Sequence, residues 1–256
     1  MDINQNLRVS TMTIISNIGS NIILDGLFKN LETDDNIKYI EYGKLNKGVN
    51  TKKQRKPRKN VEKKYFYNQV TLHVELDKII NLKIFNNGKL QMTGVKNKTQ
   101  ADSVIDILIS KLSSIDNKSD ILDNFDLKKK DFKIVLINSD FNIRFKINRN
   151  ILHRIVTSNG YYSSYEPSIY PGVNIKYYYN HLYNDGICRC HGKCSGKGNG
   201  DGESDCKKIT VAVFNSGNII ITGAQSNNQL NTAYEFINNL LKEKREELEL
   251  NKKEID

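Results

Sequence analysis

Four cysteines and one histidine gather in a glycine-rich stretch of the chain. The cysteines are Cys188, Cys190, Cys194 and Cys206, and His191 lies among them. Four thiolates can bind Zn²⁺ tetrahedrally, and His191 is a possible substitute for one of them. The spacing is not that of a familiar zinc finger, so free thiols and disulfides stay open as alternatives. We expect a structural zinc, because cysteines with no common task would be dispersed along the chain.

The same stretch could instead serve catalysis, in two ways. A cysteine beside His191 could act as a nucleophile with its base, but no third residue that would orient the imidazole is recognisable. The run Gly196–Gly202 could cradle a phosphate, but it lacks the Gly-Lys-Ser/Thr spacing and no helix follows it. We therefore expect no enzymatic activity, and we interpret the run as a flexible loop tip.

A second constellation, of aromatic residues and threonines, occurs twice. The segments FNNGKLQMTGV and FNSGNIIITGA begin at Phe85 and Phe214, 129 residues apart, and each has a Thr eight residues after the Phe, at Thr93 and Thr222. Self-similarity of this kind predicts one structural unit that is present twice. Aromatic residues beside a Gly turn in both copies favour a nucleic-acid partner over a small-molecule pocket.

The charge of the chain agrees with a polyanionic partner. Its 256 residues include 39 Lys and Arg against 29 Asp and Glu, a net charge of +10. Eight of the basic residues and only one acidic residue lie between Thr51 and Lys64. Such a run can follow phosphates, or it can be an ordinary solvated loop, and the two interpretations are compatible.

The elements that must position these residues recur in the same order in each half: a strand, a short helix, further strands with a Gly hairpin, and a long helix. In the first half we expect strands at 11–18, 37–42, 66–76, 79–85 and 89–93, and helices at 22–31 and about 99–114, the latter beginning at a Thr99-x-x-Asp102 capping pattern. In the second half we expect strands at 132–137, 175–179, 209–214 and 219–222, and helices at 148–156 and about 227–245, the latter capped by Ser226-x-x-Gln229.

These elements predict two domains and a tail. The first repeat spans 8–125 with a basic insertion at 44–64, and the second spans 126–241 with a Cys/Gly-rich insertion at 181–206. The charged tail, 242–256, is expected to extend past the fold. Helices on one face of a sheet leave the other face open, and here that face would be rich in Phe, Val and Thr, which suits a binding surface.

Four segments, in this order, resemble the TATA-box-binding protein family. They are Asn17-Ile18-Gly19, the segment from Phe85 to Gly94, Ser163-Ser164-Tyr165-Glu166-Pro167 with the Tyr170-Pro171-Gly172 that follows, and the segment from Phe214 to Gly223. The resemblance covers roughly Arg8 to Leu241. It implies an α+β fold of two pseudo-symmetric repeats that form a saddle, with one curved antiparallel sheet on the concave face and helices on the convex face.

The resemblance also implies a function: a general transcription initiation factor that binds and kinks promoter DNA through the minor groove and nucleates the preinitiation complex. Kinking by inserted aromatic wedges is the mechanism established for this family. Matched residue by residue, the DNA-binding set is the wedge pairs Phe66 with Phe85 and Tyr170 with Phe214, the groove residues Thr11, Thr93 and Thr222, and the phosphate-binding Lys89, Lys96 and Lys176.

The chain departs from the family pattern at several of these positions. The family's symmetric pair of Asn is replaced by Thr11 and Leu136, although a shift of two residues would bring in Asn138. Two basic positions of the first repeat are Asn218 and Gln225 in the second. The preference for a TATA sequence is therefore open, and the alternative function is a saddle-shaped protein-interaction scaffold that has lost sequence-specific binding.

The resemblance implies protein partners as well. The segment with Glu166, Ser168 and Ile169 would dock a factor like transcription factor IIB, and a factor like IIA and the RNA polymerase machinery are further expected partners. No signal peptide or membrane-spanning run is visible, so we expect an intracellular protein at a nucleus or a viral transcription site, without a membrane partner. Heavy use of Asn, Ile and Lys suggests an AT-rich genome, such as that of a large DNA virus or a protist.

Overall fold

The computed structural model describes residues 6–50 and 64–250. Most of the basic run between Thr51 and Lys64 therefore lies outside the described residues, as does the last part of the charged tail. Contacts divide the chain into two units, which are Thr11–Val135 and the combination of Met1–Ser10 with Leu136–Asp256. We call them the first-repeat unit and the second-repeat unit.

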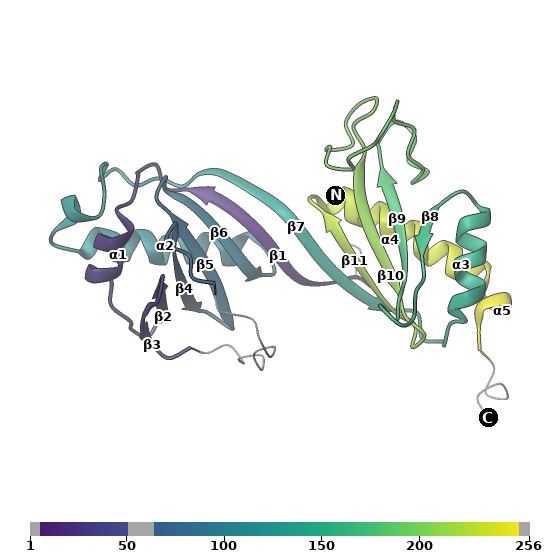
Figure 1. Cartoon of the computed structure of the whole chain (residues 1–256), viewed down its shortest axis with the longest axis horizontal. Helices are drawn as coiled ribbons and strands as arrows, with labels where there is room; N and C mark the ends of the chain where they lie inside the picture. Colours follow the sequence, from purple (N-terminus) through teal and green to yellow (C-terminus); the bar gives the residue numbers. More distant parts are fainter. Residues whose placement is uncertain (1–5, 51–63, 251–256) are drawn as a thin grey trace. The chain divides into compact units, whose positions relative to one another are not determined.

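The first-repeat unit contains a sheet and two helices, drawn in purple to teal in Figure 1. Its strands follow the order β3-β2-β4-β5-β6-β1, and every pair of neighbours is antiparallel. The elements are β1 (Arg8–Asn17, of which Arg8–Ser10 belong to the second-repeat unit), α1 (Leu24–Asn30), β2 (Ile37–Tyr42), β3 (Leu45–Gly48), β4 (Gln69–Glu75), β5 (Ile79–Phe85), β6 (Lys89–Val95), α2 (Lys98–Ser114) and a 3₁₀ turn (Lys118–Asp120).

The second-repeat unit repeats this plan, from the teal β7 to the yellow α5 in Figure 1. Its strands follow the order β7-β11-β10-β9-β8, again antiparallel throughout. The elements are β7 (Lys130–Asn142), α3 (Arg149–Ser158), β8 (Tyr162–Ser164), β9 (Val173–Tyr179), β10 (Lys207–Val213), β11 (Asn218–Ala224), α4 (Asn227–Glu243) and α5 (Arg245–Leu248). The predicted α+β class is thereby confirmed.

Alternation along the strands separates a buried face of each sheet from an open face. In β4, Val70, Leu72 and Val74 are buried against the helices, and their neighbours in the sequence point to the other side. The long helices complete each core with one apolar stripe. Those stripes are Ala101, Val104, Ile105, Leu108 and Leu112 on α2, and Leu230, Ala233, Tyr234, Ile237 and Leu241 on α4.

The two long helices begin with the same hydrogen-bond pattern. Ser226 accepts from the backbone N–H of Gln229 at 3.3 Å, as the sequence predicts. In α2 the capping residue is Asn97, which accepts from the backbone N–H of Gln100 at 2.8 Å, so the predicted start at Thr99 is two residues too late. Asn is as good a cap as Thr because its side-chain oxygen also reaches the free backbone donors.

The repeated Gly of the two hairpins is required by space as well as by conformation. Gly88 has φ +73°, and a Cβ there would lie 2.1 Å from the carbonyl oxygen of Ser20. Gly217 has φ +80°, and a Cβ there would lie 2.4 Å from the carbonyl oxygen of Phe145. Because each turn sits against the connection that follows the first strand of its unit, the repeat seen in the sequence is a repeat in structure.

Two further expectations need correction. The strand expected from residue 66 begins only at Gln69. The charged tail, expected to extend past the fold, instead packs against it up to Leu250. Leu248 is fully buried, and Leu250 donates its backbone N–H to the carbonyl oxygen of Lys146 at 3.0 Å. Among the described helices, none has the length and apolarity needed to cross a bilayer.

Candidate nucleic-acid interface and cysteine cluster

The open face of the second-repeat sheet carries two adjacent rows of residues. Cross-strand pairing joins Asn138, Thr222, Thr210 and Lys176 in one row, and Asp140, Ile220, Ala212 and Asn174 in the next. Phe214 follows Ala212 by two positions on β10, so its ring lies on this same face. The predicted groove residue Thr222 and wedge residue Phe214 are thus brought to one surface.

Tyr170 and Phe214 form an aromatic pair at the end of this face. Their ring centroids are 5.7 Å apart and the ring planes meet at 60°. Gly172 lies under both rings, and a Cβ there would come within 2.8 Å of Tyr170 and 3.2 Å of Phe214. The absence of a side chain at Gly172 therefore allows the two predicted wedges to meet.

The first-repeat unit does not bring its predicted pair together. Phe85 lies on the open face opposite Gln69, but no ring contact joins it to Phe66 among the residues that the structure describes. By register, Tyr67 occupies the position of Tyr170, since Val70 pairs with Ile84 as Val173 pairs with Val213. The Tyr67 ring instead packs edge-on against Tyr42 at 5.9 Å.

Phe66 nevertheless lies on the open face of the sheet. Its side chain is 57% exposed and lines a cavity of about 340 Å³ together with the open-face residues Gln69, Thr71 and Lys83. Phe66 and Phe85 are therefore separate aromatic groups rather than one stacked pair. Three consecutive aromatic residues begin at Tyr65. Spacing alone therefore does not tell which of them would stand beside Phe85.

The centre of each open face is a pair of cross-strand residues. Thr93 pairs with Thr13, and Thr222 pairs with Asn138 and donates its hydroxyl hydrogen to the Asn138 amide oxygen. Thr11 lies on the other side of a β-bulge between Met12 and Thr13. The alternative alignment, shifted by two residues, therefore matters, because Asn138 rather than Leu136 lies beside the central Thr222.

The three predicted phosphate-binding lysines differ in their surroundings. Lys89 and Lys96 are exposed at the two ends of β6. Lys176 is half-buried and donates to the Thr210 hydroxyl at 2.9 Å, and burial, with the nearby charge of Lys208, lowers its pKa. Lys83 is not among the candidate binding residues predicted from the sequence. Alternation along β5, counted from Phe85, would have placed it on the open face.

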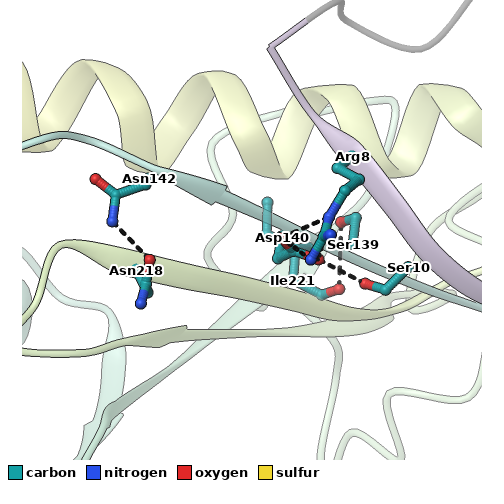
Figure 2. A network of polar contacts seen from close by, with 7 residues as sticks. All are labelled: Arg8, Ser10, Ser139, Asp140, Asn142, Asn218 and Ile221. Atoms are coloured by element: carbon teal, nitrogen blue, oxygen red, sulfur yellow. Dashed lines mark hydrogen bonds and ion pairs between the residues drawn. The ribbon is translucent and has the colours of Figure 1, made fainter.

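A polar network that the sequence did not reveal lies beside the central row (Figure 2). Arg8 donates from Nη2 to Asp140 Oδ1 at 2.9 Å and from Nε to Oδ2 at 3.0 Å. Ser10 donates to Asp140 Oδ1 at 2.8 Å. Because Arg8 and Asp140 are 132 residues apart, no local pattern could have paired them.

The predicted partner-binding residues form a tight turn before Tyr170. The backbone N–H groups of Ile169 and Tyr170 both donate to the carbonyl oxygen of Glu166, at 3.0 and 2.9 Å. The Ser168 hydroxyl donates to the Glu166 carboxylate at 2.7 Å. Ile169 is 84% exposed, so the turn presents an acidic and an apolar side chain to solvent.

The four cysteines converge between β9 and β10. Their sulfur atoms all lie within 4.8 Å of one another, and all four thiols are free. A tetrahedral Zn–S distance of about 2.3 Å requires sulfur–sulfur spacings of this order, so the donor set fits zinc. His191 is exposed and is not part of the cluster. Burial raises the pKa of Cys206 to about 12 and that of Cys194 to about 11.

The glycine-rich loop beside the cluster is held by its own polar contacts. Asp205 Oδ2 accepts from the backbone N–H groups of Asn199, Gly200 and Asp201 at 3.1–3.2 Å. Asn180 donates to the carbonyl oxygen of Gly202 at 2.7 Å. The loop tip is therefore ordered by a carboxylate rather than by apolar packing.

The chain is similar in sequence to a family model and to several known proteins. The family model described as transcription factor TFIID (or TATA-binding protein, TBP) matches residues 131–244. The chain is 32% identical over 263 residues to a TATA-box-binding protein-like protein of Acanthamoeba polyphaga mimivirus, covering 92% of this chain and 65% of that protein. It is 29% identical over 160 residues to TATA-box-binding protein 2 of Arabidopsis thaliana, covering 62% of this chain and 61% of that protein.

The fold has a solved counterpart. A structure of Methanococcus jannaschii TBP matches with a TM-score of 0.56 and 20% identity, over 93% of this chain and 99% of that chain. The chain spans less than two thirds of the length of the curated relatives named above. The solved structure shows that the fold is shared. The repeated units, the matched segments and the sequence similarities show that the chain is a divergent member of the TATA-box-binding protein family.

Proposed function

We propose that the chain is a transcription initiation factor that binds and kinks promoter DNA through the minor groove. The observation that carries the proposal is the open sheet face in each unit. Each face has a threonine at its centre, Thr93 or Thr222, and a phenylalanine at its end, Phe85 or Phe214. Phe85 and Phe214 each lie beside a Gly turn and are half-buried, so each ring is held by its neighbours and still presents part of its surface for insertion between bases. Wedge insertion pays for unstacking by bending the duplex around more protein surface.

The contact partners are expected to be double-stranded, AT-rich DNA and the general transcription machinery. A groove reader needs small residues where backbones approach closely, and Thr93, Thr210 and Thr222 meet that need. Exposed Lys89 and Lys96 at the ends of β6 would contact phosphates. The site of action would be a nucleus or a viral transcription site.

A bending assay tests the proposal. Short AT-rich duplexes labelled for FRET at both ends should bend when the wild-type protein binds, and Phe85→Ala with Phe214→Ala should remove most of the bend and lower the affinity by about tenfold or more. Phe125→Ala is the matched control, because Phe125 is 59% exposed and lies outside the sheets. Replacing A·T by I·C pairs keeps the minor-groove acceptors and should preserve binding.

Unchanged bending in the double variant would contradict the wedge assignment. If the wild-type protein binds no DNA but does bind transcription factors, the alternative of a protein-interaction scaffold is favoured. The two outcomes are distinct, because the first leaves a DNA-binding protein and the second does not.

We also propose that Cys188, Cys190, Cys194 and Cys206 bind one structural Zn²⁺. The convergence of four thiols in the connection between β9 and β10 supports the proposal, and the metal would tie the start of β10 to the segment that follows β9. Since Asp205 already orders the loop tip, metal removal should expose mainly residues 187–194 to proteases. Zinc has no expected role in base recognition.

Elemental analysis of protein purified without chelator should find about one zinc per chain. Cys190→Ser should lose the metal, and the control His191→Ala should keep it, because the imidazole lies outside the cluster. A metal-free preparation with four freely titrating thiols and protease resistance equal to that of the zinc-loaded protein would overturn this second proposal.

A further inference from the structure

Asp140 places a carboxylate on the open face of the second-repeat sheet. It pairs with Ile220, whose partner on β10 is Ala212, so it lies between the central row and the end that Phe214 occupies. Its side chain is 30% exposed. A residue at this position would meet base edges in any DNA that lies along the face.

The carboxylate is fixed in orientation by two residues of β1. Arg8 binds both oxygens, and Ser10 binds Oδ1 (Figure 2). Bidentate, charge-assisted pairs of this kind are geometrically specific. A carboxylate offers about four acceptor directions. Arg8 shares the hydrogens of Nε and Nη2 between the two oxygens, and Ser10 adds a third hydrogen at Oδ1, so one direction on Oδ2 stays open. Asp140 can therefore accept from a further donor without losing its supports.

Only one base group in the minor groove is a donor. A·T and T·A pairs present the acceptors adenine N3 and thymine O2, whereas a G·C pair adds the N2 amino group of guanine. A carboxylate pressed against acceptors loses its water and gains nothing in return. Against an amino group it gains a charge-assisted hydrogen bond.

We propose that Asp140, positioned by Arg8 and Ser10, accepts a hydrogen bond from the N2 amino group of a guanine and so selects a G·C pair at one position of the binding site. The proposal rests on the proposed minor-groove function. It makes Asp140 a specificity-determining residue and Arg8 a positioning residue.

The matching position of the first repeat cannot do the same. Ile15 pairs with Gln91 two residues from the Thr13–Thr93 pair, as Asp140 pairs with Ile220 two residues from the Asn138–Thr222 pair. An isoleucine side chain has no acceptor. The guanine is therefore expected in one half of the site only, and this asymmetry would set the direction in which a protein of two similar repeats lies on DNA.

The test compares guanine with inosine, which lacks only the N2 amino group. One G·C pair is moved stepwise through an AT-rich duplex, and each duplex is compared with its I·C counterpart for binding to the full chain. At one position guanine should bind about tenfold more tightly than inosine. A 2,6-diaminopurine·T pair, which restores the amino group, should bind like G·C there.

Variants assign the effect to Asp140. Asp140→Ala, or the nearly isosteric Asp140→Asn if the first variant does not fold, should abolish the guanine-to-inosine ratio. Asp106→Ala removes the same charge from an exposed position on α2 and should leave the ratio unchanged. Arg8→Ala should reduce the ratio, because the carboxylate loses its fixed orientation.

The outcomes separate this inference from the function on which it rests. Binding and bending of AT-rich duplexes with no position that prefers guanine over inosine would overturn the inference alone, as would a ratio that survives in both Asp140 variants. Failure to bind any duplex would overturn the proposed function itself.

Discussion

The turn that presents Glu166 is anchored on helix α3. The Arg149 guanidinium lies over the Tyr165 ring at 5.4 Å and also donates to the carbonyl oxygen of Pro171, so both ends of the turn are held. Within the turn, two backbone N–H groups converge on the Glu166 carbonyl oxygen. Arg149 and the backbone contacts thus fix the path of the chain, and the exposed Glu166 carboxylate, which accepts from the Ser168 hydroxyl, faces solvent where a partner can reach it.

Charge reversal at Glu166 should affect partner binding and not DNA binding. We expect Glu166→Arg to weaken a ternary complex with a factor like transcription factor IIB by about tenfold, because like charges at an interface are strongly unfavourable. Binary DNA binding should change by less than about twofold, since a single exposed charge contributes little. Mobility shifts with and without the factor measure both quantities.

Glu203→Arg is the matched control, because Glu203 is exposed in the insertion away from this turn. Equal losses of binary and ternary binding in Glu166→Arg would mean that Glu166 supports the fold of the turn rather than a docking surface.

Single residues on the open faces were predictable where a hairpin fixes them, and not elsewhere. Phe214 and Thr222 flank one tight Gly turn, so their spacing alone puts them on one face. Asn138 depends on a β-bulge between Thr222 and Ala224, and a shift of one residue moves every side chain to the other face. The pairing of Arg8 with Asp140 depends on long-range contacts that one sequence does not reveal.

At the scale of elements, hydrogen bonds tie the connection after α2 to the connection after β1, and several of them end on one carboxylate. Asp123 accepts from the Ser20 hydroxyl at 2.8 Å and from the backbone N–H of Asn21 at 2.8 Å. These hydrogen bonds, that from Ser20 foremost, lower the pKa of Asp123. The connection after β1 packs against the Gly88 turn, so this contact helps to position the Phe85 end of the sheet.

The lowered pKa predicts a pH dependence of stability. The folded-state value lies below the unfolded value of about 3.9, so the stabilisation is complete above that pH and is lost as the pH falls through the folded-state value. Urea unfolding at several pH values between 3 and 7 should show this loss in the wild type. Asp123→Asn should be less stable at pH 7 and should fall less steeply in acid.

Asp126→Asn, in the same connection, controls for the removal of one carboxylate. Parallel stability curves for the wild type and Asp123→Asn would show that this carboxylate has no part in the acid response.

The sequence predicted the elements that pack through a stripe of apolar side chains, but not those that polar contacts hold in place. The long helices α2 and α4 follow apolar stripes that any periodicity count detects. Strand β3 has no such pattern, and Lys47 holds it by donating to the carbonyl oxygen of Leu31 at 3.0 Å. Helix α5 lies in a run of charges, and it is docked by the backbone hydrogen bond from Asn148 to Leu248 and by one buried side chain, that of Leu248.

At the scale of the whole molecule, the basic groups of the two repeats are unequal. Lys89 and Lys96 flank β6 in the first repeat, and the matching positions at β11 are Asn218 and Gln225. The half-buried Lys176 is already committed to Thr210. Phosphate contacts should therefore be concentrated in the first repeat, while selection of bases by Asp140 would belong to the second.

The salt dependence of DNA binding measures this inequality. Each phosphate contact contributes about 0.9 to the slope of log K against log salt concentration. We expect Lys89→Ala to reduce the slope by about 1 and to weaken binding similarly on all sequences. Asn218→Ala, at the matching turn position of the second repeat, should leave the slope unchanged because a neutral amide releases no counterion. Equal slopes for Lys89→Ala and the wild type would contradict the uneven distribution, and so would a reduced slope in Asn218→Ala.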